Sequence, residues 1–253
     1  MTLTATTWHN IEVANSIVPV AGKMLRIVES QEQVATTHVV DSLAEQALLE
    51  ELLEKAKPPM RPGSEDLHYL LLTPFRYPPL MHGSRFGQRH EPSIFYGSLT
   101  AATALVEASY YRLVFWFGMQ KPPLRPIRSR HTLFSVTYQT RSGVELHQAP
   151  FDEHRTILTC PTDYSETQEL GRCMRESRVL AFEFHSARDP EGGINVGLFE
   201  PSALSVSQPC HQEEWLCDVD GDTVCFLHLS ARQAHSFPVE TFLISGRFPA
   251  PAA

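Results

Sequence analysis

The chain has 253 residues, 42% of them hydrophobic, and a formal net charge of −8 at pH 7. This length suits one domain with an appended segment. The acidic balance argues against nonspecific binding to DNA or RNA, which requires clustered Lys and Arg. Residues 1–16 lack a basic head followed by an apolar run, and no stretch of about 18 apolar residues is present. We therefore expect a cytoplasmic protein without a membrane span.

Three parts are expected along the chain: an N-terminal extension over residues 1–66, a main domain over 67–248 and a Pro/Ala-rich, disordered tail over 249–253. In the extension, Asp41 to Glu45 resembles a capping box and predicts a helix with a leucine stripe that ends near Lys57. We expect this stripe to pack on the main domain, although self-association is an alternative.

The main domain is expected to begin with a strand at His68–Leu72, and 19 prolines and 13 glycines favour short elements joined by many turns. Further along we expect helix 166–177, capped by Ser165, and a turn at Gly143 between two strands. The remaining predicted strands are 132–139, 179–185, 203–208, 214–219 and 224–229, with a hairpin turn at 218–222.

The stretch from Pro74 to Arg112 carries the strongest chemical signal. Arg85 lies in a loop between Gly83 and Gly87, where the backbone can approach a ligand closely and a guanidinium can bind phosphate oxygens. Tyr96 ends a short strand, and its ring can stack on a heteroaromatic group. Glu107 lies beside the apolar face of a helix that begins at Thr100, where a carboxylate is costly unless it is paired or lines a cleft.

No metal site is expected. Cys210, Cys217 and Cys225 lie near His211, but their intervals of 7 and 8 residues lack the close cysteine pair that is typical of zinc sites. Five cysteines, an odd number, fit reduced thiols in a cytoplasmic protein.

Four pieces of the chain, taken in order, resemble the RES domain family of bacterial toxins. They are an Arg-Phe pair after a glycine (Arg85), a strand that ends in Tyr96, a Thr-Ala-Leu-Val-Glu helix that ends in Glu107, and Ser186 ahead of an Asn-X-X-Leu-Phe-X-Pro string that begins at Asn195. Arg85, Tyr96 and Glu107 follow one another at intervals of 11 residues. The resemblance covers roughly residues 67–201.

The resemblance implies an α+β fold similar to that of ADP-ribosyltransferases, with a split, mostly antiparallel sheet and flanking helices. It also implies a toxin that degrades NAD at the nicotinamide–ribose bond, by hydrolysis or by phosphorolysis with inorganic phosphate. The implied partners are an Xre-type helix-turn-helix antitoxin and a second copy of the chain in a homodimer.

Under this resemblance Glu107 stabilises the developing oxocarbenium ion, and Arg85 binds the pyrophosphate or an incoming phosphate. Tyr96 stacks on the nicotinamide ring, while Ser186 and Asn195 help to bind and orient NAD. Two alternatives use the same residues: an ADP-ribosyltransferase that modifies a protein, and a non-catalytic module that binds NAD or a partner. A hydrolase built on His185 and Ser186 fits poorly, because neighbouring strand residues point to opposite faces.

Overall fold

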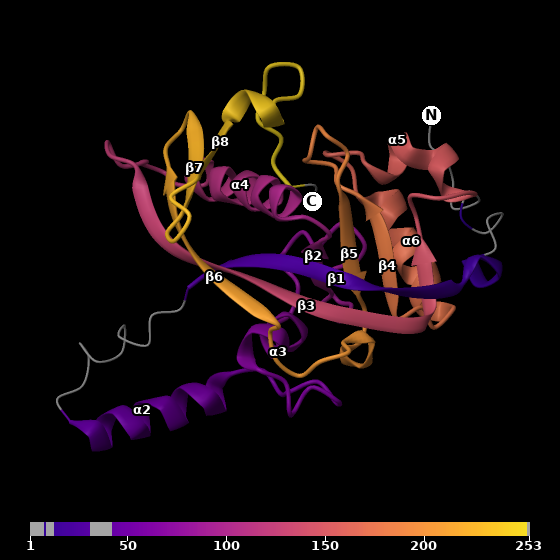
Figure 1. Ribbon diagram of the computed structural model, residues 1–253, viewed down its shortest axis with the longest axis horizontal. Helices are drawn as coiled ribbons and strands as arrows, with labels where there is room; N and C mark the ends of the chain where they lie inside the picture. The colour runs from indigo at the N-terminus through magenta and orange to yellow at the C-terminus, as the bar shows by residue number, and fades with distance from the viewer. Residues whose placement is uncertain (1–7, 9–12, 31–41, 252–253) are drawn as a thin grey trace.

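The computed structural model of the chain describes residue 8, residues 13–30 and residues 42–251 (Figure 1). Eight strands form one sheet in the order β1-β2-β5-β4-β3-β6-β7-β8, with an additional β1–β3 pairing. Its only parallel pair in the described residues is β3–β4. The expected α+β class with a mostly antiparallel sheet and flanking helices is therefore confirmed. The strands are β1 Val18–Glu29, β2 Phe95–Ser98, β3 Ile127–Glu145, β4 Ala181–His185, β5 Ile194–Leu198, β6 His211–Val219, β7 Thr223–His228 and β8 Ala234–Pro238.

The long strand β3 divides the sheet into two lobes. Its first half, from Ile127 to Ser135, pairs with β6, whereas its last residues, Gly143 to Glu145, pair with β4. β6, β7 and β8 continue on one side of the molecule, and β4 and β5 stand on the other (Figure 1). The predicted turn at Gly143 is wrong, because this residue continues β3 and pairs with both Val18 and Ala181.

The N-terminal 66 residues contribute a strand that the sequence did not reveal. β1 pairs with β3 in antiparallel register from Val18↔Gly143 to Glu29↔His131. β1 also meets β2 at Leu25↔Ser98, so that β1, β2, β5, β4 and β3 close into a ring of pairings. The extension that we expected before residue 67 is thus partly built into the sheet.

Helix α4 is the helix that positions the site. It begins where expected, since Thr100 is its N-cap and the Thr100 hydroxyl accepts a 3.1 Å hydrogen bond from the Thr103 N–H. No helix in the described part of the chain is long and apolar enough to cross a membrane. The α-helices are α2 Leu43–Ala56, α3 Tyr69–Arg76, α4 Ala101–Phe117, α5 Arg155–Leu158 and α6 Ser165–Glu176, and the 3-10 helices are η1 Val13–Ser16, η3 Phe151–His154, η4 Pro201–Ala203 and η5 Val239–Phe242.

Residues 69–72 belong to a helix, which corrects the first strand predicted at 68–72. His68 is the N-cap of α3, and its Nδ1 accepts a hydrogen bond from the Leu70 N–H. Leu70, Leu71 and Phe75 are buried on one face. The run of four apolar residues after His68 has no periodicity that separates a strand from a buried helix, which explains the error.

Two smaller expectations also change. The predicted strand 203–208 is absent: after η4 its residues are irregular, with an isolated bridge between Leu204 and Tyr138. Ser165 is the first residue of α6 rather than its cap, and Asp163 Oδ1 accepts the Ser165 N–H instead. The strands predicted at 132–139, 179–185, 214–219 and 224–229 and the hairpin turn at 218–222 correspond to β3, β4, β6, β7 and the β6–β7 connection.

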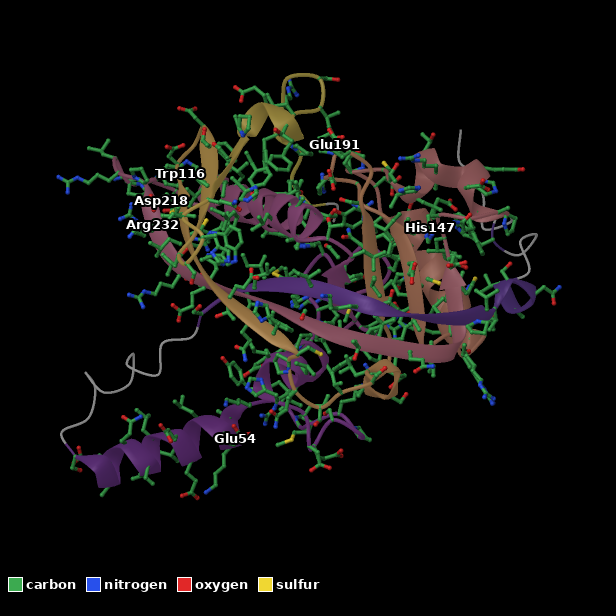
Figure 2. The ribbon with its side chains drawn as sticks, viewed as in Figure 1. Glu54, Trp116, His147, Glu191, Asp218 and Arg232 are labelled. Carbon is green, nitrogen blue, oxygen red and sulfur yellow. The ribbon has the colours of Figure 1, made fainter. Side chains whose placement is uncertain are left out.

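Helix α2 extends away from the sheet (Figure 1). Its N-cap Ser42 accepts the Glu45 N–H, and Asp41 lies outside the described residues. Leu48 and Leu52 are 56% and 54% exposed, so the leucine stripe does not pack on the domain as expected. The helix is joined to α3 near its C-terminal end, where Glu54 (Figure 2) accepts a 2.6 Å hydrogen bond from Arg76.

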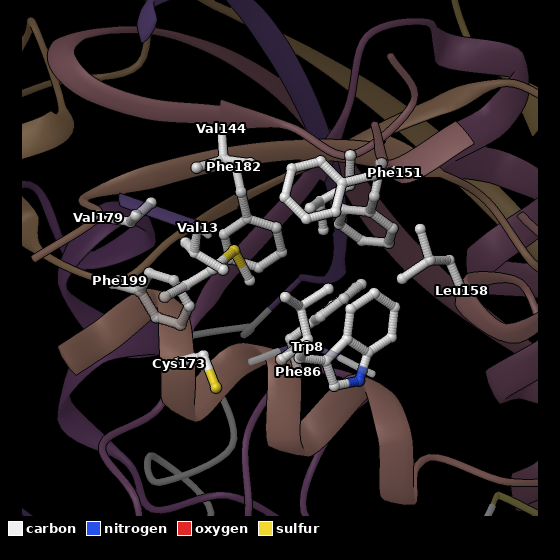
Figure 3. Packing of buried hydrophobic residues seen from close by; sticks show 14 of the residues in the cluster. Trp8, Val13, Phe86, Val144, Phe151, Leu158, Cys173, Val179, Phe182 and Phe199 are labelled. Carbon is white, nitrogen blue, oxygen red and sulfur yellow. The ribbon is translucent and has the colours of Figure 1, made fainter. Parts of the chain in front are cut away.

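Buried side chains form three clusters around the sheet. Figure 3 shows the cluster that packs between α6 and the sheet, in which Phe86 meets the ring of Phe182 at a centroid distance of 4.9 Å. A second cluster lies between α3 and the sheet, and a third between α4 and strands β6 and β7. The tail over residues 249–253 is held at its start, because the Tyr110 hydroxyl donates a hydrogen bond to the Pro249 carbonyl. Within this tail, residues 252–253 lie outside the described residues.

Candidate active site

A cavity of about 700 Å³ is lined by β1, α3, β2, α4 and the loops before β2 and after β4. Of the charged residues that line it, Arg112 forms an ion pair with Glu29 at 2.8 Å. Three further arginines line it, Arg26, Arg85 and Arg188, and they face a single further carboxylate, Glu107. Although the chain is acidic overall, this cavity is locally cationic and suits an anionic ligand.

Glu107 is held by two side chains that come from distant strands. Its Oε1 accepts a 2.6 Å hydrogen bond from the Ser186 hydroxyl and another of 2.6 Å from the Asn195 side-chain amide. Asn195 is oriented in turn by Ser98, whose hydroxyl donates to Asn195 Oδ1 at 2.7 Å. Both bonds to Glu107 reach the same oxygen, and no described residue donates a hydrogen bond to its Oε2.

Ser186 is fixed by the turn that follows β4. The side chain is 4% exposed, and its oxygen accepts the backbone N–H groups of Arg188 and Asp189 at 3.0 and 2.9 Å. With both acceptor positions used, the hydroxyl proton is directed to Glu107. Ser186 therefore orients Glu107 and does not itself line the cavity, whereas Asn195 does.

Arg85 extends from the 83–87 loop to a cavity wall. Its Nη1 donates to the carbonyls of Leu158 and Cys160 at 3.2 and 3.1 Å, and its guanidinium carbon lies 5.0 Å from the Tyr164 ring centroid. The loop folds on itself: Gly83 has φ +71°, and a Cβ there would lie 2.5 Å from the Gly87 carbonyl oxygen. Gly83 is thus required by the loop's own turn rather than by a ligand.

Tyr96 lines the cavity with its hydroxyl already engaged. The hydroxyl lies 3.0 Å from Ser84 Oγ and accepts the Phe86 N–H at 3.2 Å, and burial raises the pKa of Tyr96 to about 12. The ring meets Phe182 and Phe184 at their edges, at centroid distances of 6.5 and 6.1 Å. Four of the five residues singled out from the sequence, namely Arg85, Tyr96, Glu107 and Asn195, thus line one cavity, and Ser186 lies directly behind Glu107.

Two cavity arginines were missed by the sequence reading. Arg26 of β1 donates from Nη1 to the Tyr96 carbonyl at 2.6 Å, and burial lowers its pKa to about 10. Arg188 is 6% exposed, donates to the Tyr164 hydroxyl at 3.0 Å and lies 3.6 Å from the Tyr110 ring centroid. Two signals in the sequence could have indicated these cavity residues. Arg26 is a lone arginine in a largely apolar segment, and Arg188 follows Ser186 by two residues.

The one group of clustered potential metal ligands found among the described residues lies outside this cavity. Among the described residues, Glu145, His147 and Glu183 bring one ligand atom each within 4.8 Å of one another, and Glu183 accepts a 2.6 Å hydrogen bond from the Tyr138 hydroxyl. None of these lines the cavity. Cys217 pairs with Phe226, one position from Cys225, so the two thiols belong to opposite faces of the sheet.

The fold and the cavity define an α+β protein with a locally cationic cavity next to an oriented carboxylate. The RES domain family matches residues 58–220, and the chain belongs to this family. No curated protein matches the chain. A solved structure, the M. tuberculosis MbcT–MbcA toxin–antitoxin complex, is similar with a TM-score of 0.46 and 11% identity, over 83% of this chain and 93% of that chain.

Proposed function

We propose that this protein is a toxin that degrades NAD by cleaving its nicotinamide–ribose bond. The observation that carries the proposal is Glu107, whose Oε1 is held by Ser186 and Asn195 inside a cavity that three arginines besides Arg112 line. Membership of the RES family supports the proposal, because NAD degradation is the activity that the resemblance to RES domains implies.

In the proposed reaction the bond between the ribose carbon and the nicotinamide nitrogen breaks, and its electron pair leaves with neutral nicotinamide. Because the leaving group starts as a cation, it needs no strong general acid. The ribose carbon gains oxocarbenium character, which the Glu107 carboxylate stabilises from close by. In hydrolysis, the oxygen of water forms a bond to this ribose carbon and releases a proton, which gives ADP-ribose. In phosphorolysis, an oxygen of inorganic phosphate forms this bond instead, which gives ADP-ribose 1″-phosphate.

The other residues bind and orient NAD. Arg85, Arg26 and Arg188 supply fixed positive charge for the pyrophosphate or for an incoming phosphate. Tyr96 contributes a ring surface for nicotinamide, and Asn195 lines the same cavity from the neighbouring strand β5, opposite Ser98. Ser186 and Asn195 keep Glu107 in place, so that its second oxygen can accept a ribose hydroxyl.

The test is incubation of the purified protein with NAD, with and without inorganic phosphate, followed by measurement of nicotinamide and product mass. Glu107→Gln is the matched control, because the amide keeps an oxygen for Ser186 and Asn195 but removes the negative charge. We expect turnover by the wild type and a loss of at least about a hundredfold in the variant. No nicotinamide release from folded wild type would refute NAD cleavage, and labelling of a protein by NAD would indicate a transferase.

As a RES family member, the protein is proposed to act in the cytoplasm, as a homodimer neutralised by an Xre-type helix-turn-helix antitoxin. Expression in a bacterial host should stop growth and deplete NAD, and Glu107→Gln should relieve both effects. Sedimentation of the purified protein should give twice the mass of 28.5 kDa. A monomer in solution, or growth arrest that persists in the variant, would contradict these assignments.

A further inference from the structure

Tyr111 presents an aromatic ring to the cavity one helical turn after Glu107. Residues four apart on a helix share a face, with their Cβ atoms about 6 Å apart. Both residues line the cavity, and Tyr111 remains 46% exposed. A ring on Tyr111 is therefore within reach of a group bound beside the Glu107 carboxylate.

Three other tyrosines near Glu107 have a ring face or a hydroxyl engaged, whereas Tyr69 and Tyr77 line the cavity from α3 and its C-cap and are 51% and 41% exposed. Arg85 covers the Tyr164 ring, and Arg188 covers the Tyr110 ring. The hydroxyl of Tyr96 is hydrogen-bonded, and its ring packs at the edges of two phenylalanines. Tyr111 contacts Tyr110 edge-on, with centroids 5.2 Å apart at 75°. In the described residues no guanidinium lies over the Tyr111 ring.

We infer that Tyr111 packs against the nicotinamide ring and selects the oxidised dinucleotide, an inference that rests on the proposed function. The oxidised ring is a planar cation, and it must enter a cavity that three arginines besides Arg112 line. The electron-rich face of a tyrosine attracts such a cation, which offsets part of that repulsion. The reduced ring is uncharged and loses this attraction, so the reduced dinucleotide binds more weakly.

The experiment measures binding by calorimetry in the Glu107→Gln background, where the substrate stays intact. The probes are NAD, NADH and ADP-ribose, and the variants are Tyr111→Leu and Tyr111→Phe. Phe115→Leu is the matched control, because Phe115 is an exposed aromatic on the same helix that does not line the cavity. Thermal unfolding verifies that each variant is folded.

We expect Tyr111→Leu to weaken NAD binding about five- to thirtyfold, the range of a desolvated cation–π contact, and to leave ADP-ribose binding unchanged within twofold. Tyr111→Phe should retain most of the preference for NAD over NADH, and Phe115→Leu all of it. An unchanged ratio of NAD to NADH affinity in Tyr111→Leu would overturn the inference alone. Failure of all three probes to bind the folded Glu107→Gln protein, without a change at Tyr111, would overturn the proposed function as well.

Discussion

Ser186 and Glu107 lie 79 positions apart in the chain, yet the Ser186 hydroxyl donates a 2.6 Å hydrogen bond to Glu107 Oε1. The same Ser186 oxygen accepts two backbone N–H groups of the turn after β4. One buried serine therefore stabilises a turn and orients the carboxylate of the site, and the two roles can be separated by measurement.

Ser186→Ala should lower the free energy of unfolding by about 1–3 kcal/mol, because two buried N–H groups lose their acceptor. It should also slow nicotinamide release, since Glu107 loses one of its two donors. Urea denaturation and the NAD assay measure the two effects. Ser186→Thr keeps the hydroxyl and should recover part of both, and Ser205→Ala, at an exposed position, should change neither. Wild-type stability in Ser186→Ala would contradict this assignment.

Gly171 of α6 lies against the backbone of the arginine loop. A Cβ at this position would be 2.0 Å from the Phe86 carbonyl oxygen, next to Arg85. Gly171→Ala should therefore cost about 1–3 kcal/mol of stability through overpacking and weaken ADP-ribose binding through displacement of Arg85. Gly118→Ala, at the exposed end of α4, is the control. Unimpaired binding and stability in Gly171→Ala would show that the loop does not depend on this contact.

His131 makes stability depend on pH. Burial, with the Arg112 charge as a smaller cause, lowers its pKa from 6.5 to about 4. The unfolded chain therefore binds a proton below pH 6.5 that the folded chain takes up only near pH 4, so stability falls as the pH falls through this window. The expected loss from pH 7 to pH 5 is about 2 kcal/mol by urea denaturation.

His131→Gln should flatten this pH dependence by about the same amount, whereas His90→Gln, at an exposed position, should leave it intact. An unchanged slope in His131→Gln would assign the acid sensitivity to other groups. Both variants are compared with the wild type at the same pH values.

The leucine stripe of α2 should contribute little to the stability of the isolated chain. Leu48→Gln and Leu52→Gln are expected to change the free energy of unfolding by no more than about 0.5 kcal/mol, because both side chains are exposed. Leu71→Ala in α3, where the leucine is fully buried, should cost about 2–5 kcal/mol. A large loss in either α2 variant would mean that the helix packs on the domain in solution.

Local signals in the sequence were sufficient to predict those elements whose ends are marked by nearby residues. Thr100 caps α4 as predicted, α2 begins within the predicted capping box, and the alternation before Ser186 correctly predicts a strand that ends beside it. Prediction failed for α3 and for β1. The apolar run in α3 fits either structure, and β1 is stabilised by its pairing with β3, more than a hundred residues away.

The sequence by itself determined the order of Arg85, Tyr96, Glu107 and Ser186, and with it the family, because a pattern of residue types and intervals needs no coordinates. Only the tertiary structure decided that Ser186 and Asn195 bind Glu107, that Arg26 and Arg188 join the cavity, and that Tyr111 lines it. The reason is physical: hydrogen bonds and ring contacts depend on how strands from distant parts of the chain pair, and that pairing is set by burial of the whole core rather than by local sequence.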